Sequence, residues 1–225
     1  MEYIRINRLE DPLFRSMHQL MQRVFPAEEV LEFELWREPL EDPGIRVFVA
    51  VHNGEVVGAT EYRYYADWRV AMTDFTIIGR PGLGIGRFLA RRRQDDLQAL
   101  AAEAGQPMLG MFAEIYDPYQ TSGSVHDFGG VQPMNPFVRR EVLSHLGYKR
   151  LDLAYVHPSW ENNGEPVFGL DLCFLPADET LAELPAALAL QFLRRYYAVL
   201  PNKPAAWLQM TEKLERASTV ALLPL

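Results

Sequence analysis

Gly79-Arg80-Pro81-Gly82-Leu83-Gly84-Ile85-Gly86-Arg87 is the stretch of sequence that decides the fold. It comes after a strand-like run that ends at about Ile78, and it leads into a predicted helix from about Gly84 to Ala104 that Gly105 ends. Such a turn directs several backbone N–H groups toward one point, beside the positive end of the helix dipole. We therefore expect an anion-binding turn, although glycines before a helix can also serve only to turn the chain.

Two common phosphate-binding patterns do not fit this stretch. A dinucleotide fingerprint would place the strand and its glycines near the start of a parallel βαβ series. A Walker loop would continue in Gly-Lys-Ser/Thr, which is not present here. Arg87 adds positive charge in the first helical turn, and Arg91, Arg92 and Arg93 lie one turn later.

The segments before this stretch read as a strand, two helices and a meander. Residues 3–8 alternate apolar and polar side chains, which predicts a short strand. Asp11-Pro12 is a helix start, with Asp as the N-cap and Pro at the first helical position. A second helix is predicted at about 28–37. Three strand-like runs come next, and the first two are joined by Asn53-Gly54, a strong hairpin signal; they cover residues 46–51, 55–65 and 70–78.

The segments after the long helix predict the other half of the domain. Residues 107–116 form a strand that returns to complete a βαβ unit. A glycine- and proline-rich loop at 117–136 leads to a short helix at about 137–146, which Gly147-Tyr148 closes. Residues 151–157 and 167–175 predict a final pair of strands. From about Pro176 the tail reads as helical, with Thr180-Leu181-Ala182-Glu183 similar to a capping box.

Length, charge and cysteine usage limit the class of protein. The chain has 225 residues, enough for one large domain or a domain with an appendage. A formal charge of −8 disfavours nucleic acid as a partner. The single cysteine, Cys173, and the lack of a signal peptide or an uncharged membrane-length window predict a cytoplasmic protein. We expect no metal site, because no zinc-ligand cluster is present.

The order of these elements resembles the GNAT superfamily of N-acetyltransferases over about residues 3–175. Gly82-Leu83-Gly84-Ile85-Gly86 is similar to the family's pyrophosphate loop, and Leu146-Gly147-Tyr148 is similar to its Leu-Gly-Phe/Tyr motif. The resemblance implies a mixed α/β fold whose central, mostly antiparallel sheet is splayed between strands 70–78 and 107–116. We expect an acyltransferase domain at 1–175 and a helical extension at 176–225, packed on the same domain or on a partner subunit.

The resemblance also implies acetyl-CoA as a co-substrate. The main chain of the strand before the turn would bind the pantetheine arm, and the turn would bind the pyrophosphate. Pro81 stands where the family has Arg or Gln, so either Arg80 substitutes for that residue or binding relies on backbone amides and Arg87. The expected cofactor-binding residues are Phe75, Thr76, Ile77, Arg80, Gly82, Leu83, Gly84, Ile85, Gly86 and Arg87.

Glu114 is the leading candidate for the general base. Phe112, Glu114 and Tyr116 share one face of the predicted strand, which leaves a carboxylate in an otherwise apolar run. Amine acetylation requires a base to remove the ammonium proton. A structural carboxylate paired with Arg139 or Arg140 is the alternative interpretation.

Other titratable residues are further candidates. The family's usual helix-four tyrosine falls on Leu143 here, so another group must protonate the departing sulfur. Tyr116 and Tyr119 are candidates for that acid, and Asp74 is a second candidate base. Glu61 is a candidate cleft residue, and His126 and Asp127 lie in the long loop that we consider a candidate lid.

We therefore expect an acetyl-CoA-dependent N-acetyltransferase that acts on a small amine or a peptide N-terminus. The alternative is a GNAT-fold module that binds acyl-CoA without catalysis, as a sensor or scaffold. A longer acyl donor is a third option. The apolar tail would also allow a homodimer.

Overall fold

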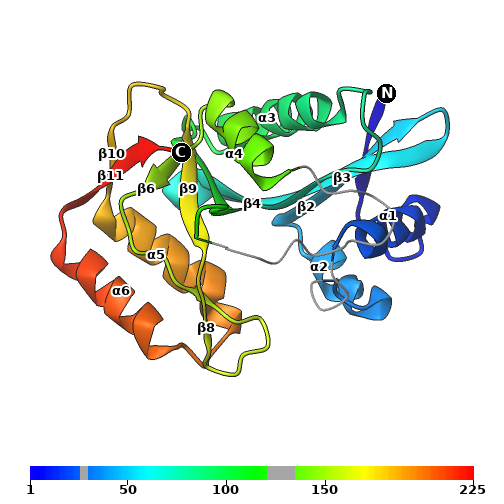
Figure 1. Ribbon diagram of the computed structural model, residues 1–225. Helices are drawn as coiled ribbons and strands as arrows, with labels where there is room; N and C mark the ends of the chain where they lie inside the picture. The colour runs from blue at the N-terminus through cyan, green and yellow to red at the C-terminus, as the bar shows by residue number, and fades with distance from the viewer. Residues whose placement is uncertain (26–29, 121–134) are drawn as a thin grey trace. The chain divides into compact units, whose positions relative to one another are not determined.

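The computed structural model describes residues 1–25, 30–120 and 135–225 (Figure 1). The chain divides into two compact units. The first consists of described residues up to Leu109, and the second of residues 110–120 and 135–225.

The sheet of the first unit is an antiparallel meander. Its strands are β1 (Glu2–Ile6), β2 (Ile45–His52), β3 (Glu55–Tyr65) and β4 (Val70–Ile78), paired in that order. The hairpin predicted at Asn53-Gly54 is confirmed, because both residues have positive φ, 52° and 79°.

Strand β4 carries a β-bulge opposite β3. Glu61 is opposite Phe75 and Tyr62 is opposite Thr73, so Asp74 is the extra residue on β4. A bulge of this kind bends the strand and interrupts its ladder of backbone hydrogen bonds.

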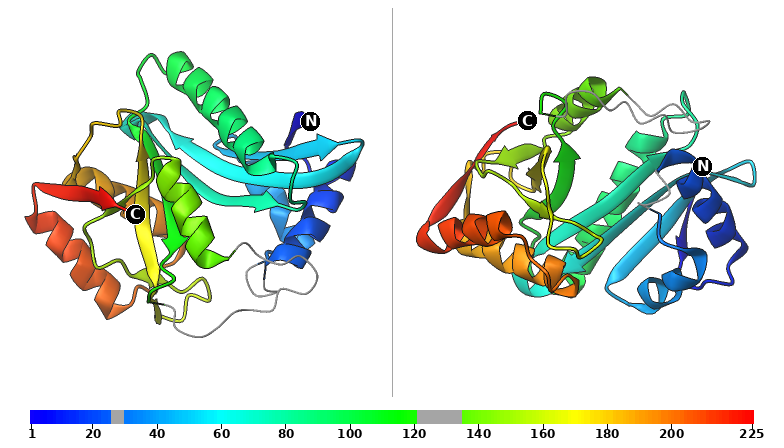
Figure 2. Two further views of the ribbon diagram at one scale, coloured as in Figure 1. Left: turned by 45° about the horizontal axis from the view of Figure 1, so that its top comes forward. Right: turned by 60° about the horizontal axis from the view of Figure 1, so that its bottom comes forward.

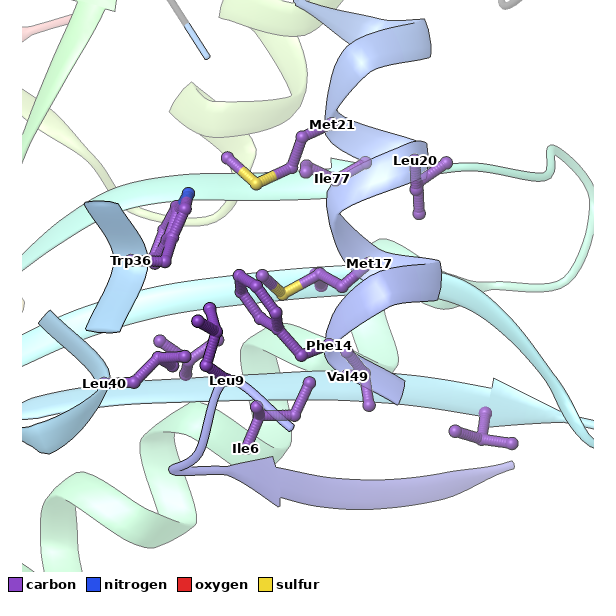
Figure 3. Close-up of a cluster of buried hydrophobic side chains, with 13 residues drawn as sticks. Ile6, Leu9, Phe14, Met17, Leu20, Met21, Trp36, Leu40, Val49 and Ile77 are labelled. Atoms are coloured by element: carbon purple, nitrogen blue, oxygen red, sulfur yellow. The ribbon is translucent and has the colours of Figure 1, made fainter. Parts of the chain in front are cut away.

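Helix α1 (Pro12–Val24) covers one face of this meander. The side chain of Asp11 accepts a hydrogen bond from the backbone N–H of Leu13, and Pro12 is the first helical residue, as predicted. Phe14 and Met17 are fully buried against the strands, beside Trp36 (Figure 3). Residues from α1, the strands and the segment before β2 therefore share one hydrophobic core.

The second predicted helix differs from the observed structure. Residues 26–29 lie outside the described part, and the chain after them forms a 3₁₀ helix, η2 (Phe33–Trp36), and a short helix, α2 (Arg37–Glu41). Pro39 lies in the first turn of α2, where the missing N–H of proline costs no helical hydrogen bond, so α2 is a separate helix that begins at Arg37.

Helix α3 (Ile85–Glu103) covers the other face of the meander. Its Ile85 and Leu89 are buried with Ala50 and Val57. The helix ends where predicted, because Gly105 has a φ of 71° and so adopts the left-handed conformation typical of a helix stop.

The strands of the second unit pair antiparallel with one another. Its strands are arranged in the order β5 (Gly110–Tyr116), β9 (Leu170–Pro176), β6 (Lys149–Leu151), β11 (Thr219–Pro224) and β10 (Glu183–Pro185). A separate short hairpin pairs β7 (His157–Pro158) with β8 (Pro166–Val167).

Helices lie on both faces of β5 and β9. Helix α4 (Pro136–His145) is joined to one face by an ion pair between Arg140 and Asp171, 2.8 Å apart. Helix α5 (Ala186–Tyr196) packs on the other face, where Phe192 stacks on Phe112. Helix α6 (Ala205–Arg216) lies beside α5, and the 3₁₀ helix η4 (Tyr197–Val199) comes directly after α5 (Figure 2).

The tail is not helical throughout, contrary to the sequence prediction. The capping box predicted at residues 180–183 is absent, because the Thr180 hydroxyl donates to Asp178 and the Ala182 carbonyl accepts from the backbone of Leu222. Glu183 begins strand β10, and the chain ends in strand β11, which pairs with β6. The backbone of this segment is satisfied by strand pairing, which local sequence signals did not indicate.

The predicted fold class is confirmed. The chain is a mixed α/β protein in which mostly antiparallel strands are flanked by helices, in the expected chain order. The splay between residues 70–78 and 107–116 concerns the two units relative to each other, and it stays a prediction.

Candidate functional site

The glycine turn of the first unit has the backbone conformation that the sequence predicts. Gly82 and Gly84 have φ values of 82° and 67°, where residues with side chains are strained. Nothing lies within 4 Å of a Cβ built on either glycine. Gly84 is the N-cap of α3, and its carbonyl accepts the first helical hydrogen bond, 3.0 Å from the Phe88 nitrogen. The turn is therefore exposed and open at the N-terminus of a 19-residue helix.

The other two glycines of the stretch have a packing role. A Cβ on Gly86 would lie 2.9 Å from the Cδ1 of Ile78, so this glycine lets the first turn of α3 approach the end of β4. A Cβ on Gly79 would lie 2.7 Å from the Leu20 side chain and 3.0 Å from the Val57 carbonyl oxygen. The stretch thus combines open positions with positions that need glycine for close packing.

The arginines near the turn divide into exposed and buried ones. Arg80 and Arg87 are exposed, and Arg80 forms a 2.6 Å ion pair with Glu55. Both partners of that pair are more than half exposed, so it contributes little to stability. Arg93 is buried, and its Nη1 donates to the hydroxyls of three threonines, Thr60, Thr73 and Thr76. Arg93 therefore fastens α3 to β3 and β4.

The β4 residues that were predicted to bind pantetheine use their side chains for packing. Phe75 and Ile77 pack in the α1 core, while the Thr76 hydroxyl accepts a hydrogen bond from Arg93 on the opposite face. Asp74 is exposed at the bulge. Burial and the charge of Asp74 raise the pKa of the Glu61 carboxyl well above its usual value. Glu61 and Asp74 therefore form an acidic pair at the bulge.

Glu114 is the centre of a polar cluster in the second unit. Its Oε1 accepts hydrogen bonds from the hydroxyls of Tyr155 and Tyr197, which lie 2.7 Å from each other. Its Oε2 lies 3.6 Å from the Nε2 of His157. The Glu114 side chain is 14% exposed and that of His157 is 6% exposed. One carboxylate oxygen is thus held by two phenols, and the other faces an imidazole.

Burial controls the protonation of this cluster. It raises the pKa of the Glu114 carboxyl, and the two tyrosine donors only partly oppose that effect. Burial lowers the pKa of His157 to about 4, so the imidazole is neutral at pH 7. Burial and the Glu114 charge raise the pKa of both tyrosines, which therefore stay protonated donors. Glu114 therefore takes up a proton at a higher pH than an ordinary glutamate does.

Arg140 does not serve as the partner of Glu114. Its Nη2 lies 2.8 Å from Asp171 and its Nη1 lies 4.0 Å from Asp117. Arg139 lies over the ring of Tyr116, 5.9 Å from its centroid. Glu114 is instead matched by neutral donors.

The remaining sequence candidates lie elsewhere. Tyr116 and Tyr119 are 41% and 76% exposed at the end of β5, and the ring of Tyr119 contacts Phe137. Asp74 belongs to the first unit. His126, Asp127 and most of the candidate lid lie outside the described residues.

Sequence reasoning missed the three residues around Glu114. Tyr155 and His157 are two positions apart in a predicted strand, so a shared face was a usable signal. Tyr197 had no local signal, because it lies 83 residues from Glu114 in a tail that was read only as a packing element.

Two further features were sought in the described residues, a membrane-length apolar helix and a cluster of metal ligands. None of the helices in that part of the chain is long and apolar enough to span a membrane. Within the same ranges, no group of three or more His, Cys, Asp or Glu side chains could hold a metal ion.

Comparisons with solved structures decide the fold. A GNAT-family protein from Bacteroides thetaiotaomicron aligns with a TM-score of 0.58 and 14% identity, over 90% of this chain and 98% of that one. The chain has the GNAT fold. An aminoglycoside 6'-N-acetyltransferase in complex with coenzyme A aligns with a TM-score of 0.52 and 18% identity, over 77% and 95% of the two chains.

A third GNAT structure is similar over most of its length. The ribosomal-protein-S18-alanine N-acetyltransferase from Escherichia coli aligns with a TM-score of 0.50 and 14% identity, over 80% of this chain and 99% of that one. No protein-family model and no curated protein sequence matches the chain. At these identities the similarity establishes the fold and leaves the activity to be argued from the residues.

Proposed function

We propose that the protein is an acyl-CoA-dependent N-acyltransferase that transfers an acetyl group to an amine. The observation that carries the proposal is the open glycine turn, with Gly82 and Gly84 in left-handed conformation at the start of α3. In a GNAT fold, such a turn suits the pyrophosphate of coenzyme A, and one similar structure has coenzyme A bound. Longer acyl chains are compatible with the same turn.

The residues in and around the turn support the proposal that it binds a pyrophosphate. Backbone N–H groups of residues 82–86 would donate to the phosphate oxygens, because no side chain covers Gly82 or Gly84. Arg87 is exposed in the first helical turn and would add charge. Arg80 would give up its ion pair with Glu55 to bind phosphate. The loss of that ion pair costs little because both partners are exposed. Pro81 has no side-chain donor for the pyrophosphate, but Arg80 before it and Arg87 after it would supply donors in its place.

Glu114 is the proposed general base. An acceptor amine is protonated at pH 7, so its ammonium must give up a proton before the nitrogen can attack. Glu114 would take that proton, and its raised pKa brings it closer to the operating pH. The amine then forms a C–N bond with the acyl carbon, the C–S bond breaks, and CoA leaves as a thiol after gaining one proton. The net reaction releases one proton to solvent.

The acceptor is proposed to be a small amine or a peptide N-terminus. Two structures of the same fold are named for such acceptors, an aminoglycoside and the alanine N-terminus of a ribosomal protein. The formal charge of −8 favours a cationic molecule over an anionic one.

A non-catalytic acyl-CoA-binding module is the second candidate. It is favoured by Leu143, which occupies the helix-four position where the GNAT resemblance places a catalytic tyrosine. Under this reading Glu114 would be only a structural carboxylate that its two tyrosines satisfy.

The test is amine-dependent release of CoA from acetyl-CoA by the wild type, Glu114→Gln and the control Glu141→Gln. Glu141 is an exposed carboxylate in α4 of the same unit. We expect release by the wild type and the control, and a loss of about 10²–10⁴-fold in kcat for Glu114→Gln with acetyl-CoA affinity retained. Wild-type protein that binds acetyl-CoA but releases no CoA with a broad amine panel would favour the module instead.

A further inference from the structure

A cluster of aromatic rings lies next to Glu114 in the second unit. The ring of His157 is 5.6 Å from that of Trp160 and 5.3 Å from that of Tyr197. Trp160 is also 6.2 Å from Tyr196 and 5.9 Å from Tyr197, and the two tyrosines are 4.8 Å apart. We name these four residues, His157, Trp160, Tyr196 and Tyr197, the aromatic wall.

The aromatic wall runs from solvent to the buried carboxylate. Trp160 is 55% exposed, Tyr196 is half-buried, and Tyr197 and His157 are buried. Tyr197 donates its hydroxyl to Glu114, and the Nε2 of His157 lies 3.6 Å from the Glu114 Oε2. The outer rings therefore present surface to a ligand, while the inner ones connect that surface to the proposed base.

Two segments are fastened together to build this wall. Trp160 belongs to the β7–β8 hairpin loop, and Tyr196 and Tyr197 belong to the end of α5 and the start of η4. Asn202 donates from its backbone and its side chain to Asn162, at 2.9 and 2.8 Å, which ties the hairpin loop to the segment after α5. The C-terminal segment thus contributes directly to the surroundings of Glu114.

The aromatic faces of the wall and the Glu114 carboxylate behind them suit a cation. Glu161 and Glu165 are exposed on the same loop as Trp160, and Arg195 is exposed directly before Tyr196 in α5. The nearby Lys203 ammonium donates to the carbonyls of Tyr197 and Leu200. Aromatic faces attract ammonium groups through their quadrupole, and a carboxylate behind them adds to that attraction.

We propose that Trp160 and Tyr196 form an ammonium-binding subsite that recognises the acceptor amine in its cationic form and delivers it to Glu114. The inference rests on the proposed function for the fate of the amine, but binding itself requires no turnover. The ligand class is a primary aliphatic ammonium ion. An uncharged molecule of the same shape should not be recognised.

The direct test is an NMR titration of the tryptophan indole N–H signals with n-butylammonium, compared with its uncharged counterpart 1-butanol. We expect saturable shifts of the Trp160 signal with the ammonium only. Trp160→Leu removes the ring, and the exposure of the site leaves folding intact. We expect this variant to weaken n-butylammonium binding by about 2- to 30-fold, as followed on tyrosine signals, while Trp160→Phe retains part of the affinity. The control Phe168→Leu, at an exposed ring of the same unit, should bind like the wild type.

Kinetics separate failure of this inference from failure of the proposed function. We expect Trp160→Leu to raise the KM for the amine in CoA release while kcat stays close to the wild-type value, because uniform binding is lost. Equal binding of 1-butanol, or an unchanged KM in Trp160→Leu, would overturn the subsite even if CoA release is intact. Saturable ammonium binding that depends on Trp160 would support it even if no amine releases CoA.

Discussion

At the scale of single residues, the proposed role of Glu114 as a base depends on what surrounds its carboxyl group. A buried carboxylate is usually matched by a cation, but here two phenols donate to one oxygen and a neutral imidazole faces the other. Neutral donors leave the pKa of the carboxyl raised, whereas an arginine partner would lower it. The arrangement therefore keeps Glu114 available for proton transfer.

The pH dependence of turnover should report Glu114. Because the base must be deprotonated, kcat for CoA release should fall as pH drops through the pKa of Glu114, which lies above that of an ordinary glutamate. Tyr197→Phe removes one donor to the carboxylate, so the acidic limb should move to higher pH. A pH–rate profile measured on both proteins checks this, and a limb that stays in place would contradict the role of the phenol.

Stability should depend on the protonation of His157. Its folded pKa, about 4, is below the unfolded value of 6.5, so the unfolded chain binds more protons between these values. Stability should therefore fall as pH drops from 6.5 to 4, by about 3 kcal/mol from this residue. Urea unfolding at several pH values should show a flatter dependence in His157→Phe; parallel curves for the two proteins would refute the prediction.

At the scale of elements, the position of α3 depends on a glycine outside the turn. A Cβ on Gly58, in β3, would lie 2.5 Å from Cγ2 of Ile85 and 2.7 Å from the carbonyl oxygen of Ile77. Gly58 therefore lets the first turn of α3 lie directly on the sheet, next to the glycine turn.

We expect Gly58→Ala to destabilise the protein by about 1–3 kcal/mol through overpacking. It should also weaken acetyl-CoA binding, because the start of α3 must shift. Chemical denaturation and calorimetry measure the two effects. Since only part of the clash is with a side chain, adding Ile85→Ala should not restore full stability. A Gly58→Ala protein as stable as the wild type would contradict the packing.

Elements with local signals were predictable from the sequence. Asp11-Pro12 and Asn53-Gly54 set the backbone conformation at their own positions. The local sequence was therefore enough to predict the helix start and the hairpin turn. The strand at 183–185 was not predictable, because its partner is β11 at the end of the chain. The same limit applies to the candidate site: Glu114 stood out in an apolar strand, but Tyr197 reaches it only through tertiary packing.

At the scale of the whole molecule, the chain consists of two units, and the C-terminal strand is an integral part of the second. Val220 and Leu222 of β11 are buried, while Ala221 and Leu223 are only half-buried. The tail therefore completes a sheet and supplies Tyr197, rather than only covering a finished domain.

We expect Leu222→Ala to cost about 2–4 kcal/mol, in the range of large-to-small core substitutions. The neighbouring Leu223→Ala, on the less buried face, should cost clearly less. If the units unfold separately in urea, only the transition of the second unit should move. Equal effects of the two substitutions would argue against the observed strand register.

The turn at residues 82–86 is the feature on which the proposed function depends most, through its binding of the acyl-CoA pyrophosphate. The most direct measurement is calorimetry of acetyl-CoA binding to the wild type, Gly84→Asp and Gly105→Asp, the last at the opposite end of α3. Both glycines have positive φ and open space around a Cβ, so the two substitutions impose comparable backbone strain and the same charge. We predict wild-type affinity for Gly105→Asp and a loss of at least about 10-fold, or about 1.4 kcal/mol, for Gly84→Asp. Equal affinities in the two variants, or a wild type that does not bind acetyl-CoA, would contradict pyrophosphate binding by this turn.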